Sequence, residues 1–211
     1  MVTRPNPTLV MHFTDVAHLA TILAEGLLCD NSAAGGLLTN EAGNPDIKAD
    51  RRHRPVKADP FGMVGDYVPF YFAALSPMMF AISHGRVPSY GTDVSGLIYL
   101  VTSTQELVAQ GLRVLVTDRN AALGYAEFRP ESESDDLVDW DLMKQRYWND
   151  TDKYPDRRER RMAECLVHGK VPFAAFGAIV AQNNQQAANV EAVLSAAGTA
   201  VSVYVIPDWY I

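Results

Sequence analysis

Cysteine is scarce in this sequence: Cys29 and Cys165 are the two among 211 residues. Two cysteines cannot make a zinc site by themselves, and they indicate no disulfide framework. No apolar run approaches the roughly 18 residues that cross a membrane, and the N-terminal residues lack the apolar core of a signal peptide. We therefore expect a cytoplasmic protein that does not enter a membrane.

Several catalytic signatures are also missing. The sequence has no P-loop, no GxGxxG after a strand, no HExxH and no GxSxG elbow. It has no HxE with PCxxC, which excludes the zinc deaminases. What remains is a carboxylate, a histidine near the N-terminus, basic segments and aromatic residues. That set suits a substrate that carries phosphates and a flat base.

Positive charge is low in total but concentrated locally. The net charge of −7 argues against binding nucleic acid over the whole surface. Residues 48–57 and 153–161 are basic, whereas residues 131–136 are acidic. Either basic run alone is most simply a solvated loop, so charge by itself does not assign a function.

Length and periodicity indicate one α+β domain over residues 1–211, with a curved, mostly antiparallel, two-sheet core and few helices. Residues 30–66 show little periodicity and are expected to form a long connection. Thr14, Ser76 and Thr104 are expected to cap helices. The predicted strands are 9–13, 67–72, 97–103, 113–117, 162–167, 177–181 and 200–206, and the predicted helices are 15–25, 77–83, 105–110, 140–143 and 184–197.

Glu164 lies where a basic segment becomes apolar. With a period of two residues, Met162, Glu164 and Leu166 share one face of a strand. A carboxylate on a buried face is costly unless it is paired, and such a residue often has a chemical task. A short helix with a solvated Glu164 fits the spacing equally well.

Five motifs in this order and spacing resemble the DarT-type DNA ADP-ribosyltransferases, the toxins of DarT–DarG toxin–antitoxin pairs. The resemblance spans nearly the whole chain. It implies an ADP-ribosyltransferase fold, transfer of ADP-ribose from NAD to a DNA base (thymine in the best-known branch) and no metal. It also implies a macrodomain antitoxin like DarG as partner. The motifs are Met11-His12-Phe13-Thr14, the basic segment with Arg51, residues 68–79, Asp118-Arg119-Asn120-Ala121 and Arg161-Met162-Ala163-Glu164.

The resemblance also implies roles for individual residues. Glu164 would stabilise the positive charge that develops on the ribose. His12 and Thr14 would bind the ADP-side ribose and the nicotinamide amide, in either allocation, and Tyr71 would stack on the nicotinamide ring. Arg51 would orient a phosphate or activate the acceptor base, and orientation is favoured because arginine keeps its proton. The alternative for His12 is a core histidine.

DNA contacts are expected from two loops. A base inside a duplex cannot present its pairing edge to such a site, so the acceptor is single-stranded or flipped out. The loop before Glu164 mixes aromatic and basic residues, as sites for single strands do, although Trp148 could instead anchor this loop in the core. The expected DNA-binding residues are Arg119, Asn120, Tyr147, Trp148, Tyr154 and Arg157.

Three other functions fit parts of this pattern. A non-catalytic module for single-stranded nucleic acid would explain the basic and aromatic loops without Glu164. An NAD glycohydrolase or a protein-directed transferase would use the same fold. We expect a monomer in each case.

Overall fold

The computed structural model describes residues 3–33, 45–87, 90–91 and 94–210. Across these ranges no helix is both long and apolar enough to cross a membrane. Residues 34–44, which belong to the predicted connection 30–66, lie outside the described residues.

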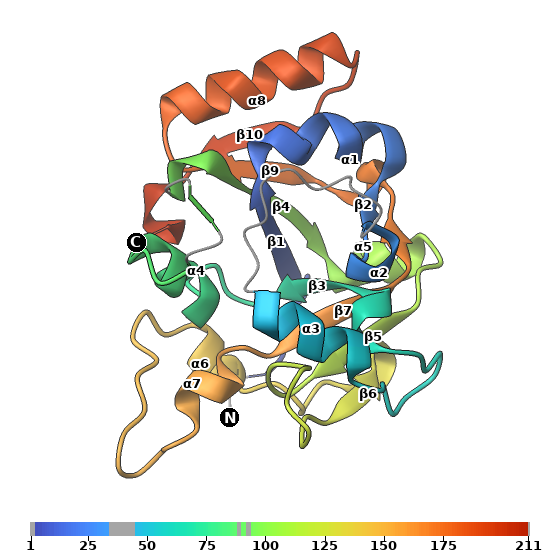
Figure 1. The fold of residues 1–211 in the computed structure, drawn as a ribbon, viewed down its shortest axis with the longest axis vertical. Helices are drawn as coiled ribbons and strands as arrows, with labels where there is room; N and C mark the ends of the chain where they lie inside the picture. The colour runs from blue at the N-terminus through green and yellow to red at the C-terminus, as the bar shows by residue number, and fades with distance from the viewer. Residues whose placement is uncertain (1–2, 34–44, 88–89, 92–93, 211) are drawn as a thin grey trace.

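One large sheet organises the fold (Figure 1). Its strand order is β10-β9-β4-β1-β3-β7-β5-β6, with every neighbouring pair antiparallel except β9 and β10. A small antiparallel sheet pairs β2 with β8. The expected α+β class with a mostly antiparallel core is confirmed. The strands are β1 Leu9–Asp15, β2 Leu27–Leu28, β3 Tyr67–Tyr71, β4 Leu97–Ser103, β5 Val114–Thr117, β6 Phe128–Pro130, β7 Glu164–His168, β8 Lys170–Val171, β9 Ala178–Ala181 and β10 Ser202–Val205.

The large sheet is nearly divided between β1 and β3. β1 pairs with β4 over seven residues, from Leu9–Ser103 to Asp15–Leu97. All residues of β1 and β3 are described, and Met11–Tyr71 is the single pair between these two strands. In Figure 1, β1 crosses the end of β3 instead of running beside it. The sheet therefore consists of two four-stranded halves that meet at one residue pair.

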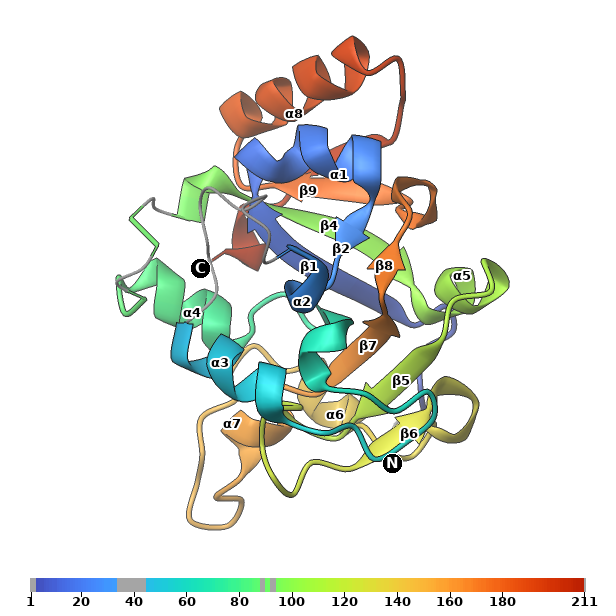
Figure 2. The same cartoon turned by 45° about the vertical axis from the view of Figure 1, so that its right-hand side comes forward.

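The helices are mostly short and cover the sheet unevenly. α1 and α8 lie side by side across one end of the molecule in both views (Figures 1 and 2). They bury Leu19 and Ile22 of α1, and Val190 and Leu194 of α8, in the core that β4 and β9 also contact. The helices are α1 Leu19–Glu25, α2 Asp30–Ala33, α3 Pro45–His53, α4 Pro77–Ser83, α5 Thr104–Ala109, α6 Trp140–Met143, α7 Arg157–Arg160 and α8 Asn184–Ala196.

Two predicted helix caps are wrong, and one is confirmed. Thr14 does not cap a helix, because β1 continues through Asp15, whose side chain accepts the Ala17 N–H; pairing with β4 extends the strand. Ser103, not Thr104, caps α5 by accepting the Glu106 N–H. Ser76 caps α4 as predicted, because its hydroxyl accepts the Met79 N–H.

Helix α3 is a further departure from the prediction. It lies within the connection predicted to lack periodicity, and its sequence PDIKADRRH has no apolar stripe. Periodicity cannot detect a helix of this kind, because its buried contact is made by the charged side chain of Arg51.

Candidate active site

Glu164 is the first residue of β7, and the residue is 1% exposed. It stands opposite Tyr71 in the β3–β7 register, next to the Met11–Tyr71 pair that joins the two halves of the sheet. The alternative in which Glu164 is a solvated helix residue is therefore wrong. The fold holds a carboxylate in the interior beside the division of the sheet.

Arg51 reaches this carboxylate from α3. Its Nη1 lies 2.9 Å from Oε1 and 3.1 Å from Oε2 of Glu164, and Arg51 is 5% exposed. Its buried Nη2 has no hydrogen-bond partner among the described residues. Buried guanidinium nitrogens are nearly always paired, so this nitrogen is available to a ligand.

The loop between β5 and β6 supplies the second contact to the carboxylate. The backbone N–H of Ala121 donates to Glu164 Oε2 at 2.8 Å. Asn120 is 8% exposed, and its side-chain oxygen accepts the Ala122 N–H at 2.8 Å, which shapes this turn. Arg119 contacts the carboxylates of Asp118 and Glu159. The structure thus brings Asn120 close to Glu164, whereas Arg119 joins this loop to the segment that precedes Glu164.

His12, on β1, has a fixed ring orientation. Its Nδ1 lies 2.7 Å from the carbonyl oxygen of Pro69 and must donate to it, which leaves Nε2 as an acceptor. Burial lowers the pKa of His12 from 6.5 to about 4, so the ring is neutral at pH 7. A neutral imidazole with a bare Nε2 can accept a hydrogen bond from a ribose hydroxyl.

Thr14 and Tyr71 are more enclosed than sequence alone indicates. The Thr14 hydroxyl is buried and lies 3.0 Å from His18 Nδ1. The Tyr71 ring stacks on Phe13, with ring centroids 6.0 Å apart. Burial and the neighbouring Glu164 carboxylate raise the pKa of the Tyr71 phenol, which therefore stays protonated. Tyr71 lies beside Glu164, whereas the Thr14 hydroxyl already has a partner within the protein.

Of the remaining predicted DNA-binding residues, Tyr147, Trp148 and Tyr154 lie on the long loop between α6 and α7, which extends away from the sheet (gold in Figures 1 and 2), and Arg157 begins α7. Tyr147 is 76% exposed, and Tyr154 is also exposed. Trp148 is half-buried and packs edge-on against Phe80 of α4. Arg157 Nη2 donates to Gln145 Oε1 and to the Tyr147 carbonyl oxygen, so Arg157 supports the loop from within.

Sequence reasoning assigned no individual role to three buried residues at or near this site, although two of them, Ala121 and Arg161, belong to the quoted motifs. The amide of Ala121 has no signature in sequence, because every residue but proline carries one. Thr117 could have been found as a polar residue at the end of an apolar strand. Arg161 is 4% exposed and donates to the carbonyl oxygens of Leu142 and Met143. Burial lowers the pKa of Arg161 to about 10, so it remains charged at pH 7.

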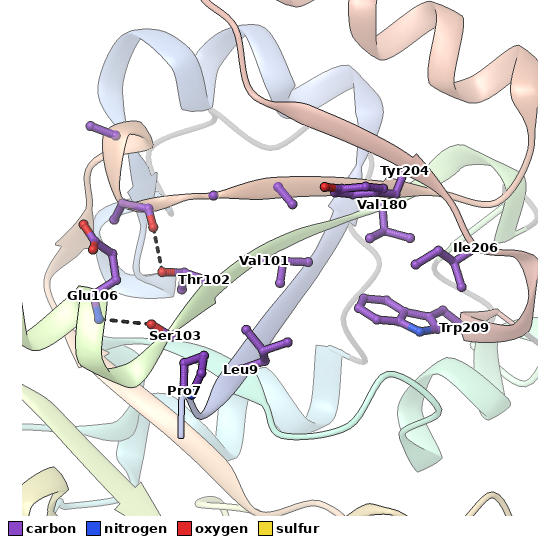
Figure 3. Close-up of a pocket in the computed structure, with 14 residues that line it drawn as sticks. Pro7, Leu9, Val101, Thr102, Ser103, Glu106, Val180, Tyr204, Ile206 and Trp209 are labelled. Atoms are coloured by element: carbon purple, nitrogen blue, oxygen red, sulfur yellow. Dashed lines mark hydrogen bonds between the residues drawn. The ribbon is translucent and has the colours of Figure 1, made fainter. Parts of the chain in front are cut away.

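A groove of about 550 Å³ lies apart from this site (Figure 3). Figure 3 shows Leu9, Val180, Tyr204, Ile206 and Trp209 directed into it. None of the residues assigned above to the active site lines this groove. The site around Glu164 is therefore identified by its buried charges and not by the volume of a cavity.

The histidine, the tyrosine and the buried glutamate beside the division of the sheet are the residues to which the resemblance assigns NAD binding and catalysis in an ADP-ribosyltransferase. Residues 11–211 match the family model described as ssDNA thymidine ADP-ribosyltransferase, DarT. The chain belongs to this family, and the resemblance drawn from the five motifs is confirmed.

Individual relatives agree with the family match. A DNA ADP-ribosyl transferase from Mycobacterium tuberculosis is 34% identical over 98% of this chain and 90% of its own length. The solved structure of DarT from Thermus sp. 2.9 in complex with ADP-ribosylated ssDNA has a TM-score of 0.93 and 30% identity, and the match covers 100% of this chain and 99% of that one. The same Thermus protein in complex with NAD+ matches with a TM-score of 0.88 and 30% identity over 99% of this chain and 100% of that one.

Proposed function

We propose that this protein transfers ADP-ribose from NAD to a thymine base in single-stranded DNA. The observation that carries the proposal is the buried Glu164 carboxylate, which is held by Arg51 and by the Ala121 amide beside the division of the sheet. Membership of the DarT family supports the choice of NAD and of a DNA base.

The reaction breaks the bond between nicotinamide and the ribose C1′ and forms a bond from the same carbon to the base. Positive charge develops on the ribose as nicotinamide leaves, and a carboxylate in a desolvated site stabilises that charge. Thymine in a nucleotide carries one N–H, on its pairing edge, and this nitrogen attacks C1′. The N–H proton leaves as the new bond forms. We assign proton acceptance to Glu164, because Arg51 beside a carboxylate keeps its own proton.

Three groups in the site fit the parts of NAD. Arg51 Nη2 is a buried donor without a partner among the described residues, and it suits a phosphate or a ribose hydroxyl. His12 Nε2 suits a ribose hydroxyl. Tyr71, which lies beside Glu164, would contact the nicotinamide ring, whereas Thr14 would need its hydroxyl to exchange His18 for the cofactor.

The single-stranded substrate would lie along the loop between α6 and α7. Tyr147 and Tyr154 present exposed rings on which bases can stack, and Lys153 and Arg158 add exposed positive charge. The half-buried Trp148 would support the loop and offer one edge to DNA. Arg119 and Asn120 would contact DNA mainly at the end of this surface nearest Glu164, because both side chains already have partners within the protein.

We further propose that residues 1–211 act as a single monomeric domain and as the toxin of a toxin–antitoxin pair in the cytoplasm. A bulky charged group on the pairing edge of a base blocks that base as a template. The matching antitoxin would carry a DarG-like macrodomain that removes the ADP-ribose. An acidic surface on that partner would complement the basic segments at 48–57 and 153–161.

The test is incubation of the protein with labelled NAD and with single-stranded oligonucleotides that differ by one thymine. Label should enter DNA only where thymine is present, and Glu164→Gln should abolish the transfer. Glu191→Gln on the exposed face of α8 is the matched control and should be fully active. Label on protein would indicate a protein-directed transferase, and free ADP-ribose alone would indicate a glycohydrolase.

NAD binding distinguishes the proposed enzyme from a non-catalytic module that binds single-stranded nucleic acid. NAD at about 100 times its dissociation constant stabilises a protein by about 2.7 kcal/mol, whereas a protein without an NAD site shows no thermal shift.

A further inference from the structure

Thr117 connects the backbone of Glu164 to the turn that holds the Glu164 carboxylate. The residue ends β5 and is 0% exposed. Its Oγ1 accepts the N–H of Glu164 at 3.1 Å and lies 2.6 Å from the carbonyl oxygen of Arg119, to which it donates. One buried hydroxyl therefore links the start of β7 to the loop between β5 and β6.

The same loop returns to the carboxylate two residues later. Ala121 donates its backbone N–H to Glu164 Oε2 at 2.8 Å. The path from the Glu164 backbone through Thr117, Arg119 and Ala121 to the Glu164 carboxylate is thus closed by hydrogen bonds. The β5–β7 pairing ends one residue earlier, at Val116–Cys165, so between these two strands the Thr117 hydroxyl makes the last link to Glu164, whose other side pairs with Tyr71 of β3.

We propose that Thr117 is a positioning residue for the Glu164 carboxylate. Its hydroxyl sets the distance between the Glu164 backbone and the Ala121 amide, which holds Oε2, whereas Arg51 Nη1 contacts both carboxylate oxygens. This inference rests on the proposed function of Glu164. Because Thr117 has no exposed surface, it acts through Glu164 and does not touch NAD or DNA.

Removing the hydroxyl should slow the chemical step more than it weakens substrate binding. Thr117→Val keeps the shape of the side chain but leaves the Glu164 N–H and the Arg119 carbonyl without this partner. A displacement of about 1 Å in a reacting group can cost about 100-fold in rate. We expect kcat to fall about 10- to 100-fold, with the KM for NAD changed by no more than about threefold.

The experiment compares kcat and the KM for NAD in Thr117→Val, Thr117→Ser and Thr102→Val. Thr102, in β4, is the matched control. Its buried hydroxyl also donates to a carbonyl oxygen at 2.6 Å, that of Ala175. Thr117→Ser should restore kcat to within about threefold of wild type, and Thr102→Val should keep it. If Thr117→Val does not fold, the pair Thr117→Ser and Thr117→Ala isolates the hydroxyl.

Several outcomes would overturn the inference. These are a wild-type kcat in Thr117→Val, an equal kcat for the serine and alanine variants, or an equal loss in Thr102→Val. Loss of kcat in Thr117→Val together with full activity in Glu164→Gln would overturn it as well, and would also remove the proposed role of Glu164. Inactive Glu164→Gln with fully active Thr117→Val would remove only the role of Thr117.

Discussion

The guanidinium of Arg51 lies within 3.1 Å of both oxygens of Glu164, although the two residues are 113 positions apart in sequence. The side chains are 6% and 2% exposed, so the pair is shielded from water. Breaking such a pair leaves an uncompensated charge in the interior, which costs more than the pair contributes when intact.

Removal of the Arg51 charge should therefore destabilise the protein strongly. We expect Arg51→Met to lower the free energy of unfolding by about 3–5 kcal/mol, measured by urea denaturation. Arg51→Met combined with Glu164→Gln should recover part of that loss and remain inactive. Arg113→Met is the control, because Arg113 pairs with Asp59 at 3.8 Å on the surface, and it should change stability by less than about 1 kcal/mol. Equal effects at both arginines would contradict this assignment.

The two aromatic residues at the start of the long loop should separate DNA binding from stability. Tyr147→Ala should weaken binding of a single-stranded oligonucleotide by about 1–3 kcal/mol without changing the melting temperature, because the ring is 76% exposed. Trp148→Ala should also lower the melting temperature, because it removes the contact with Phe80. NAD affinity should be unchanged in both variants. Unchanged oligonucleotide affinity in Tyr147→Ala would exclude this loop from the DNA surface.

His12 predicts a specific dependence of stability on pH. Its pKa is about 4 in the folded protein and 6.5 in an unfolded chain, so between these values the unfolded chain binds a proton that the folded protein does not. His12 therefore lowers the free energy of unfolding as pH falls from about 6.5 to 4. His12→Asn should lack this contribution. The free energy of unfolding of wild type, relative to that of the variant, should therefore decrease as pH falls from about 6.5 to 4. An NMR titration of the His12 ring with a midpoint near 6.5 would rule this out.

Gly26 follows α1 and Gly198 follows α8, and both have positive φ. Comparing substitutions at the two glycines tests the packing at the end of α1. Gly26 has φ +83, and a Cβ there would lie 2.7 Å from the carbonyl oxygen of Val171. Gly198 has φ +65, and a Cβ there would meet nothing within 4 Å. Gly198→Ala should cost about 1 kcal/mol from backbone strain, whereas Gly26→Ala should cost at least about 2–3 kcal/mol. Equal losses in thermal denaturation would mean that β8 moves aside freely.

Sequence patterns predicted the parts of this fold that depend on local chemistry. The strands around Val68, Leu100 and Ile179 follow from apolar runs, and the Ser76 cap follows from a serine before a proline. Placement of Glu164 on a strand was one of two interpretations that the spacing left open. Its burial and its pairing with Tyr71 decide between them.

The features that sequence could not provide depend on contacts between distant segments. Helix α3 lacks an apolar stripe, and its contact with Glu164 is made by the charged Arg51, so periodicity does not reveal it. Ala121 contributes a backbone amide, which no residue type reveals. Thr14 belongs to β1 because β4 pairs with it, although its side chain is that of a common helix cap.

The single Met11–Tyr71 pair gives the two halves of the sheet a pivot. His12 belongs to one half of the sheet, and Tyr71 and Glu164 belong to the other. A nucleotide in contact with all three residues would therefore bridge the two halves. Besides this backbone pair, the His12–Pro69 hydrogen bond and the Phe13–Tyr71 stack join the halves, so side chains set the angle at which the two halves present their groups to each other.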